Sequence, residues 1–308
     1  MDVSIIIVNW NTRNILRDCL ESVYARTKDI AFEVIVIDNA SSDGSVDMIK
    51  RRFPQVRLIE NTENQGFAAA NNQGMRIAQG RYMLLLNSDT IVLDGAVPRA
   101  VTFADRHPEA GVVGCRVLNA DRSLQITCFM FPSALNLLLW ITYLYKVFPR
   151  SRFWGRGRMT WWNRDDVREV DVVTGCFMLV RQEAIDRVGL MDEQFFMYAE
   201  EADWCYRFYQ AGYKRLFTPE VQIIHLGGAS SDQIKPRMIT EWRRSTLLYF
   251  KKHAGPLSQG AAWTLLNTFY LTRVPYWVAR AAVGRIRSHR PVRPVETVSQ
   301  SRCDEDGT

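Results

Sequence analysis

Apolar, β-branched segments alternate with helix-like segments through the first half of this chain. The strand-like segments are residues 3–8, 33–37, 56–60 and 82–86. The segments between them that are predicted as helices are residues 14–25, 45–53 and 66–79. Strands and helices that alternate in this way form a parallel sheet with helices packed on its faces. The sequence therefore predicts an α/β fold with a Rossmann-like, mostly parallel central sheet.

The second half of the chain is patterned less regularly. Residues 134–169 are rich in Trp, Tyr, Leu and Arg and contain several helix breakers. Residues 170–180 and 221–226 are predicted as strands, and residues 200–210 as a helix that Gly212 ends. The segment from residue 291 onward is rich in Pro, Ser and charged residues, a composition typical of disorder.

The cysteine pattern favours neither a disulfide framework nor a structural zinc site. Six cysteines are scattered along the chain without a C-x-x-C pair: Cys19, Cys115, Cys128, Cys176, Cys205 and Cys303. This spacing fits a protein of a reducing cytosol. No signal peptide is expected, because Met1 and Asp2 lead directly into apolar residues 3–8 without a basic segment.

The net charge of +6 is distributed unevenly. Residues 235–295 hold twelve Lys and Arg against one acidic residue, Glu241, which leaves 27 basic and 32 acidic residues elsewhere. The main body is therefore mildly acidic and the C-terminal segment strongly basic. Such asymmetry indicates an anionic partner, either a membrane surface or a nucleic acid.

Two apolar segments bear on membrane association. Residues 135–148 are too few to span a bilayer. Residues 261–283 mix aromatic residues with Arg273, Pro275 and Arg280, which favours an amphipathic helix at a membrane surface. The arginines that would meet anionic headgroups are Arg285, Arg287, Arg290 and Arg293. The alternative is a helix packed on the preceding domain, followed by a solvated basic tail.

Polar residues follow two of the predicted strands, where ligands bind in open α/β sheets. Asp38 ends the second strand, and its carboxylate can accept the N3–H of uracil or thymine. Asp89 follows the strand at residues 82–86 and is a hard oxygen ligand of the kind that Mg²⁺ or Mn²⁺ prefers. Each segment is also compatible with an ordinary capped turn. In the helix between them, Asn71 and Asn72 are poor helix formers that suggest hydrogen bonding to a ligand or a loop, or tight packing.

Three acidic residues open the predicted helix at residues 200–210: Glu200, Glu201 and Asp203. The helix dipole favours ionised carboxylates there, as a general base requires, although acids are common in first helical turns. Downstream, His225 ends an apolar strand before two glycines and is either a metal ligand or a structural residue.

Taken in order, these segments resemble the family 2 glycosyltransferases with the GT-A fold, particularly the bacterial rhamnosyltransferase-like branch. The resemblance covers about residues 1–250. Its residues are Asn9-Trp10-Asn11, Asp38-Asn39-Ala40-Ser41-Ser42-Asp43-Gly44-Ser45, Asn64-Gln65-Gly66-Phe67-Ala68-Ala69-Ala70-Asn71, Asn87-Ser88-Asp89, Thr174-Gly175-Cys176-Phe177-Met178, Glu200-Glu201-Ala202-Asp203 and His225. Two departures stand out: Asn87 replaces the first acid of the family's D-x-D motif, and Glu201 replaces the aspartate of its Glu-Asp pair.

The resemblance implies roles for individual residues. Glu201 would be the general base, supported by Glu200 and Asp203, while Asp89 and His225 would hold Mg²⁺ or Mn²⁺. The implied nucleotide-sugar-binding residues are Asn9, Asn11, Asp38, Asn39, Asn64, Gly66, Asn71, Asn87, Ser88 and Asp89. The implied acceptor-binding residues are Gly175, Cys176 and Tyr198.

The expected function is therefore inverting sugar transfer from a nucleotide-diphosphate donor to a hydroxyl of a polyprenyl-diphosphate-linked saccharide, in cell-envelope polysaccharide synthesis. L-Rhamnose from dTDP-rhamnose is the first expectation, and galactofuranose or another hexose from a UDP-sugar the second. Residues 1–255 would form the catalytic GT-A domain, residues 256–290 a basic amphipathic segment on the cytoplasmic face of the cell membrane, and residues 291–308 a disordered tail.

Two other classes remain as alternatives. A sugar-phosphate nucleotidyltransferase usually has a glycine-rich loop after the first strand, but Asn9-Trp10-Asn11-Thr12-Arg13 contains no glycine. A nucleic-acid-binding protein would suit the basic pI of about 9.0. The mildly acidic main body and the lack of a binding motif disfavour it, so no nucleic-acid partner is expected.

Overall fold

The computed structural model describes the backbone of residues 1–227 and 235–288. The chain divides into two compact units, residues 1–265 and residues 266–308. The first unit contains the sheet and the candidate site. The described part of the second unit continues the helix that begins at Pro256.

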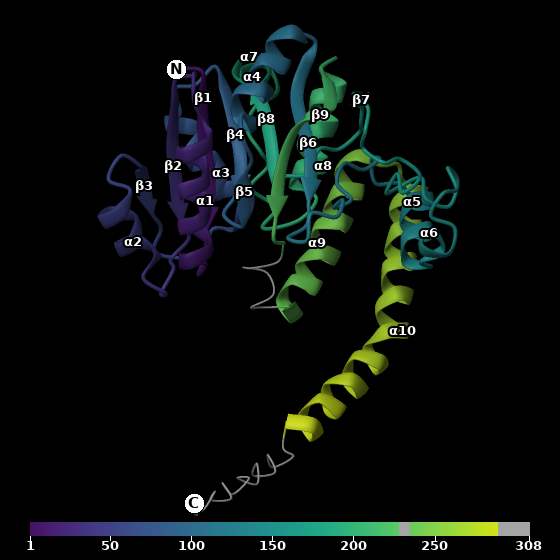
Figure 1. Ribbon diagram of the computed structural model, residues 1–308. Coiled ribbons are helices and arrows are strands. Elements are labelled where there is room, and N and C mark those ends of the chain that lie inside the picture. Colours follow the sequence, from purple (N-terminus) through teal and green to yellow (C-terminus); the bar gives the residue numbers. More distant parts are fainter. Residues whose placement is uncertain (228–234, 289–308) are drawn as a thin grey trace, which may run out of the picture. The chain divides into compact units, whose positions relative to one another are not determined.

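The strands of the first unit form one mixed sheet in the order β3-β2-β1-β4-β8-β6-β9-β5, with β7 paired to β9 (Figure 1). From β3 to β4 neighbouring strands are parallel, whereas β8 is antiparallel to both β4 and β6. The strand bounds are β1 Val3–Asn9, β2 Phe32–Asp38, β3 Arg57–Glu60, β4 Tyr82–Asn87, β5 Thr90–Val92, β6 Ala110–Leu118, β7 Arg168–Glu169, β8 Phe177–Arg181 and β9 Lys214–His225.

Helices cover both faces of this sheet (Figure 1). The bounds of the described helices are α1 Arg13–Arg26, α2 Ser45–Arg52, α3 Gly66–Ile77, α4 Ala96–Arg106, α5 Ala134–Ile141, α6 Leu144–Val147, α7 Gln182–Val188, α8 Glu200–Gln210, α9 Lys235–His253 and α10 Pro256–Ser288. The predicted α/β architecture with helices at the C-terminal end is confirmed.

Strand β1 shows how the apolar pattern builds two layers. Its alternate residues Ile5 and Ile7 join the core that α1 and α4 cover, because successive side chains of a strand point to opposite faces. Ile6 therefore faces α3, where an added Cβ at Gly74 would lie only 2.6 Å from Ile6 Cγ2. The absence of a side chain at Gly74 lets α3 pack tightly against the centre of the sheet.

The prediction of one strand over residues 170–180 is wrong, because only Phe177–Arg181 is a strand there. The preceding β7 pairs with β9, whereas β8 lies on the other side of β6. Residues 170–176 therefore pass from one side of β9 and β6 to the other, and Val173 packs against β6, where an added Cβ at Gly114 would lie 2.7 Å from Val173 Cγ1. Within this segment Val172 forms an isolated β-bridge to Phe129. The crossing brings Gly175 against Phe67, whose ring would lie 3.0 Å from an added Cβ.

No described helix is both long enough and apolar enough to cross a membrane. The predicted disorder of residues 291–308 concerns residues outside those that the structure describes.

Candidate active site

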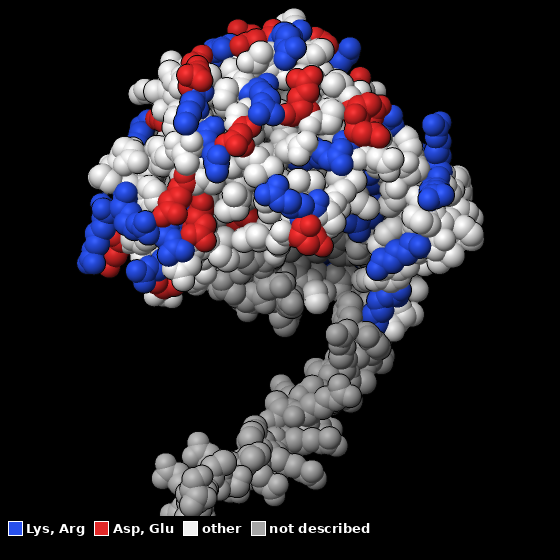
Figure 2. All heavy atoms as spheres, in the orientation of Figure 1, with Lys and Arg blue, Asp and Glu red and all other residues white. Residues whose placement is uncertain are grey.

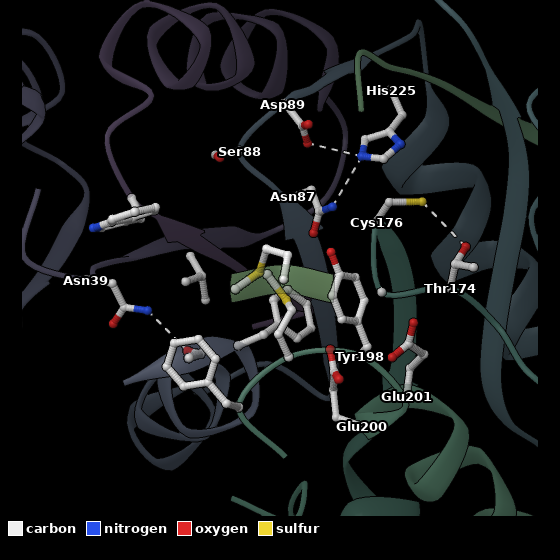
Figure 3. A pocket seen from close by; sticks show the side chains of 18 of the residues that line it. Asn39, Asn87, Ser88, Asp89, Thr174, Cys176, Tyr198, Glu200, Glu201 and His225 are labelled. Carbon is white, nitrogen blue, oxygen red and sulfur yellow. Dashed lines mark hydrogen bonds and ion pairs between the residues drawn. The ribbon is translucent and has the colours of Figure 1, made fainter. Parts of the chain in front are cut away.

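A cavity of about 350 Å³ opens at the carboxyl ends of β1 and β4, where ligands bind in open α/β sheets (Figure 3). The loop before α8 and the end of β9 close its other sides. The predicted site residues that line it are Asn39, Asn64, Gly66, Asn87, Ser88, Asp89, Gly175, Cys176, Tyr198, Glu200, Glu201 and His225. Segments from both halves of the chain therefore meet in one place.

Asn9, Asn11 and Asp38 are predicted nucleotide ligands that the structure does not place in this cavity. Asp38 is only 1% exposed, and its two oxygens accept hydrogen bonds from Asn9 Nδ2 at 2.8 Å and from the Ser41 N–H at 2.8 Å. Asn11 Oδ1 accepts from the Ser42 N–H at 2.8 Å. These side chains hold the loop after β2, and that loop positions Asn39.

Asn39 connects the loop after β2 to the start of α3. Its Nδ2 donates to Asn64 Oδ1 at 3.3 Å and to the Gly66 carbonyl at 3.1 Å, while Asn64 Oδ1 also accepts from the Gly66 N–H at 2.9 Å. Gly66 has φ +81°, and an added Cβ would lie 2.3 Å from the Phe196 carbonyl oxygen. Only glycine fits at this position, and the close approach joins α3 to the aromatic loop before α8.

The two mid-helix asparagines of α3 hold protein rather than line the cavity. Asn71 Nδ2 donates to the Phe67 carbonyl one turn earlier, at 2.9 Å. Asn72 Nδ2 donates to the Met191 carbonyl at 2.9 Å, and its Oδ1 accepts from the Met191 N–H at 3.1 Å. Asn72 therefore fulfils the hydrogen bonding of the Met191 backbone in the neighbouring loop. This role explains why a poor helix former stands in the middle of α3.

Asp89 and His225 meet at the cavity wall (Figure 3), with His225 Nε2 3.1 Å from Asp89 Oδ1 and 3.2 Å from Asn87 Nδ2. Gln125 Nε2 donates to Asn119 Oδ1 and to the His225 carbonyl, so its Oε1 accepts from His225 Nδ1–H at 2.7 Å. With Nδ1 as the donor, the Nε2 lone pair of the imidazole faces both the amide of Asn87 and the carboxylate of Asp89.

This arrangement fits a divalent cation. Two ligands in adjacent positions of an octahedron, each about 2.1 Å from Mg²⁺ or a similar ion, lie about 3 Å apart. The separation of 3.1 Å between Asp89 Oδ1 and His225 Nε2 matches that spacing. Among the described residues, no three His, Cys, Asp or Glu side chains form a metal-binding group. The remaining coordination positions would fall to water and substrate phosphates, which Mg²⁺ commonly retains.

Glu200 and Glu201 begin α8 on the opposite side of the cavity (Figure 3). Tyr198 and Ala199 both have left-handed backbone conformations, with φ +69° and +64°, a costly turn that delivers Tyr198 and the acidic pair to the cavity. Within the described residues, Oε2 of each glutamate is buried without a hydrogen-bond partner. Substrate groups can therefore be received there.

Burial raises the pKa of both carboxyls in this pair. The pKa of Glu200 lies well above its usual value, through desolvation and then through the negative charge of Glu201. Desolvation also raises the pKa of Glu201, while hydrogen bonding to Glu200 acts in the opposite direction. The rise is the greater at Glu200, so Glu200 holds its proton to the higher pH and Glu201 is the better candidate for the base.

Asp203 lies outside the cavity, although the sequence grouped it with the acidic pair. Its fully buried carboxylate accepts from Arg207 Nε at 2.9 Å, contacts His253 Nε2 at 2.7 Å and pairs with Lys252. Because Lys252 and His253 belong to α9, this cluster connects α8 to α9. Asp203 can therefore support the Glu200–Glu201 pair only by holding α8 in place.

The predicted acceptor residues Gly175, Cys176 and Tyr198 all line the cavity. Burial raises the pKa of the Cys176 thiol to about 11, so this side chain stays protonated and is a poor nucleophile. Sequence reasoning gave no site role to the lining residues Trp10, Gln125, Thr174, Phe196 and Met197. Phe196 and Met197 belong to an aromatic patch before the acidic pair that the sequence makes visible, whereas nothing near Gln125 indicates a partner of His225.

The chain belongs to the glycosyltransferases of family 2, because the model described as "Glycosyl transferase family 2" matches residues 4–189. Members of this class move a sugar from a nucleotide-sugar donor. The chain is 25% identical over 276 residues to an N-acetylglucosaminyl-diphospho-decaprenol L-rhamnosyltransferase of Mycobacterium tuberculosis, covering 83% of this chain and 86% of that protein.

Two solved structures share the fold. One is a mannosyltransferase from Pyrobaculum calidifontis in complex with GDP-Man and Mn²⁺, with TM-score 0.57, 16% identity and coverage of 94% of this chain and 81% of that one. The other is residues 1–349 of TarS from S. aureus, with TM-score 0.53, 14% identity and coverage of 89% and 73%. The expected GT-A-type architecture is thereby confirmed.

Proposed function

We propose that this family 2 enzyme transfers L-rhamnose from dTDP-rhamnose, with inversion, to a hydroxyl of a polyprenyl-diphosphate-linked saccharide. The observation that carries the proposal is the cavity in which the Glu200–Glu201 pair faces Asp89 and His225. One side offers a buried base for an acceptor hydroxyl, and the other offers ligands beside the leaving diphosphate. The M. tuberculosis relative, whose name includes both L-rhamnose and a diphospho-decaprenol acceptor, supports the choice of sugar and acceptor.

The reaction is a single displacement. Glu201 accepts the proton of the acceptor hydroxyl while the hydroxyl oxygen forms a bond to the anomeric carbon. The bond from that carbon to the diphosphate oxygen breaks at the same time. Asp89 and His225 would hold Mg²⁺ or Mn²⁺, which supplies positive charge to the leaving nucleoside diphosphate. Asn39, Asn64 and Gly66 border the donor side. Attack opposite the leaving group inverts the anomeric configuration.

A donor and acceptor assay tests this function directly. The purified chain with Mn²⁺ and a polyprenyl-diphosphate-linked N-acetylglucosamine is expected to transfer sugar from dTDP-rhamnose at least about tenfold faster than from UDP-galactofuranose or other UDP-hexoses, because the donor site must distinguish both base and sugar. Product NMR should show an inverted anomeric centre. Transfer only from a UDP-hexose would replace the proposed donor with the second candidate, and retention of configuration would contradict the single displacement.

We further propose that the basic segment at residues 256–290 holds the enzyme on the cytoplasmic face of the cell membrane. The support is the charge excess of residues 235–295 and the helix α10, Pro256–Ser288. A basic amphipathic helix binds anionic surfaces through apolar contact and charge.

Liposome flotation measures this association. Full-length protein is expected to float with vesicles containing anionic phospholipid and to remain behind with neutral vesicles. Replacing Arg285, Arg287, Arg290 and Arg293 with glutamine should weaken binding, at about 1 kcal/mol for each arginine near the surface. Equal flotation of both proteins on both vesicle types would rule out this mode of attachment.

A further inference from the structure

A second cavity of about 490 Å³ adjoins the first and is not used by the donor side. Tyr198 and Glu201 line both cavities. Its other walls come from α5, α9 and the segment around residues 154–158. Its volume falls within the range of small-molecule sites. Glu201 therefore stands between two spaces, as a base that serves a donor and an acceptor must.

Aromatic side chains form much of this second cavity. Trp140 of α5 and Trp242 of α9 lie with ring centroids 4.6 Å apart, and both line the cavity together with Phe129 and Tyr145. Aromatic walls with a few placed polar groups are typical of pockets for organic ligands. The apolar faces of a sugar ring can pack on such rings while the hydroxyls reach polar atoms.

Two residues that line this cavity carry buried side-chain oxygens without a hydrogen-bond partner among the described residues. The oxygens are Asn136 Oδ1 and Glu201 Oε2. Asn136 is 9% exposed, and its Nδ2 already donates to the Phe131 carbonyl at 2.9 Å. Because an unmade hydrogen bond at a buried acceptor is costly, these oxygens call for a ligand that donates, such as a hydroxyl-rich sugar.

Arg158 adds a positive charge to the same cavity. Its guanidinium lies over the rings of Phe129 and Tyr145, at 5.6 and 5.4 Å from the ring centroids. Within the part of the chain that the structure describes, no carboxylate lies within ion-pair distance of it. A half-buried guanidinium in an aromatic setting is a strong site for phosphate oxygens.

Arg164 fixes the segment that presents Arg158. This guanidinium is 1% exposed and donates to backbone carbonyls, among them those of Arg158 at 2.8 Å and Thr127 at 3.1 Å. The pKa of Arg164 is lowered to about 10, mainly because burial disfavours its charged form. The nearby positive charge of Arg158 also lowers it. The two arginines therefore create a positive potential that a bound anion would offset.

Basic side chains also border this region from outside. Lys146, Arg150 and Arg152 are exposed near α5 and α6, and Figure 2 shows Lys and Arg side chains along that flank of the face in view. Such a border would attract an anionic ligand toward the cavity.

We propose that this second cavity is the acceptor site and that it binds a saccharide carried on a diphosphate. The sugar packs against the aromatic wall with its reactive hydroxyl at Glu201, and Arg158 pairs with the diphosphate. The inference rests on the proposed lipid-linked acceptor and assigns its recognition to particular residues. It requires no change in the donor side of the site.

The test compares two acceptors that differ only in the diphosphate. The probes are N-acetylglucosamine linked through a diphosphate to a farnesyl chain, and the farnesyl glycoside of the same sugar. The Arg158→Met variant is expected to raise KM for the diphosphate-linked acceptor by about 10- to 100-fold, the range for a lost charge-assisted hydrogen bond. KM for the farnesyl glycoside and for the nucleotide sugar should stay unchanged, and Arg158→Lys should recover part of the loss.

Controls separate this effect from folding and from lipid binding. Arg156→Met removes a neighbouring guanidinium that does not line the cavity and should leave both KM values unchanged. Thermal unfolding and flotation on anionic phospholipid vesicles should be the same for wild type and Arg158→Met, which would exclude headgroup phosphate as the partner of Arg158. An equal change of KM for both acceptors, or no change for either, would overturn the proposal.

A binding measurement keeps this proposal distinct from the proposed function. Calorimetry with the diphosphate-linked probe and no donor should show binding by wild type and at least about tenfold weaker binding by Arg158→Met. If the enzyme transfers sugar but wild type does not bind the diphosphate-linked probe, the acceptor-site proposal is refuted and the proposed function stands. Binding to Arg158 without transfer from any sugar nucleotide would refute the proposed function and leave the anion site standing.

Discussion

The Glu201→Gln variant is expected to lose at least about 100-fold in kcat, because glutamine cannot take the proton of the attacking hydroxyl. Its affinity for the nucleotide sugar should change little, since the amide keeps the shape of the side chain and the donor side lies across the cavity. Single-turnover kinetics separates the two quantities, and calorimetry with the nucleoside diphosphate checks binding. Turnover near the wild-type rate would contradict the assignment of the base.

The matched control is Glu200→Gln. Because Glu200 holds its proton to a higher pH than Glu201, a neutral glutamine can replace it as hydrogen-bond donor, and kcat should stay within about tenfold of wild type. A larger loss with Glu200→Gln than with Glu201→Gln would reverse the two roles.

The pH dependence has a definite sign. Burial raises the pKa of Glu201, so activity should fall on acidification at a pH above the ordinary glutamate value of 4.5. For stability, a carboxyl whose folded pKa is raised stabilises the fold at low pH and loses that contribution as pH rises through the folded pKa. The free energy of unfolding, measured from about pH 5 to 9, should therefore decline less with rising pH for Glu200→Gln than for wild type.

The Asp89→Asn and His225→Ala variants are expected to lose about 100-fold or more in kcat, since each removes one of two facing ligands and the charge at the leaving diphosphate is lost. Chelator-treated wild type should lose activity to a similar extent and recover it with Mn²⁺ or Mg²⁺. A chelator-treated enzyme that keeps full activity would exclude a divalent cation from the reaction.

Gln125 offers a sharper test of the same site. Its Oε1 accepts from His225 Nδ1 at 2.7 Å, and loss of such an orienting partner typically lowers metal affinity by about 10- to 100-fold. Gln125→Leu should therefore weaken Mn²⁺ binding, measured calorimetrically with the nucleoside diphosphate present, while saturating Mn²⁺ restores much of kcat. Glu183→Gln, on the exposed side of α7, is the control and should change neither quantity.

The local pattern of apolar residues was sufficient to predict the strands and helices of the first half of the fold. Strands β1, β2 and β4 and helices α1 and α3 lie within two residues of their predicted bounds, because apolar periodicity reports directly which side chains a sheet or helix buries. The same reasoning failed over residues 170–176, which are mostly apolar yet pass across β9 and β6 without joining the sheet as a strand. In sequence, a buried crossing segment that makes an isolated β-bridge at Val172 looks the same as a buried strand.

The candidate site divides along similar lines. Asp89, Glu201 and His225 were recognisable because each follows or ends a strand or opens a helix, and these positions gather at the active edge of an α/β sheet. Asp38 and Asn71 occupy similar positions, but the structure uses their side chains for Asn9, Ser41 and Phe67. Which polar side chain remains available to a ligand depends on neighbours that sequence spacing does not identify.

The sequence by itself determined the order of the elements, the edge of the sheet where polar residues collect, and the acidic pair that opens α8. Only the tertiary structure decided that Gln125 orients His225 across 100 positions of the chain, that Asp203 belongs to an ion-pair cluster, and that Arg158 enters the cavity beside Glu201. The physical reason is range. Periodicity and capping act within a few residues, whereas these hydrogen bonds and charges join segments that meet only when the sheet and its helices pack.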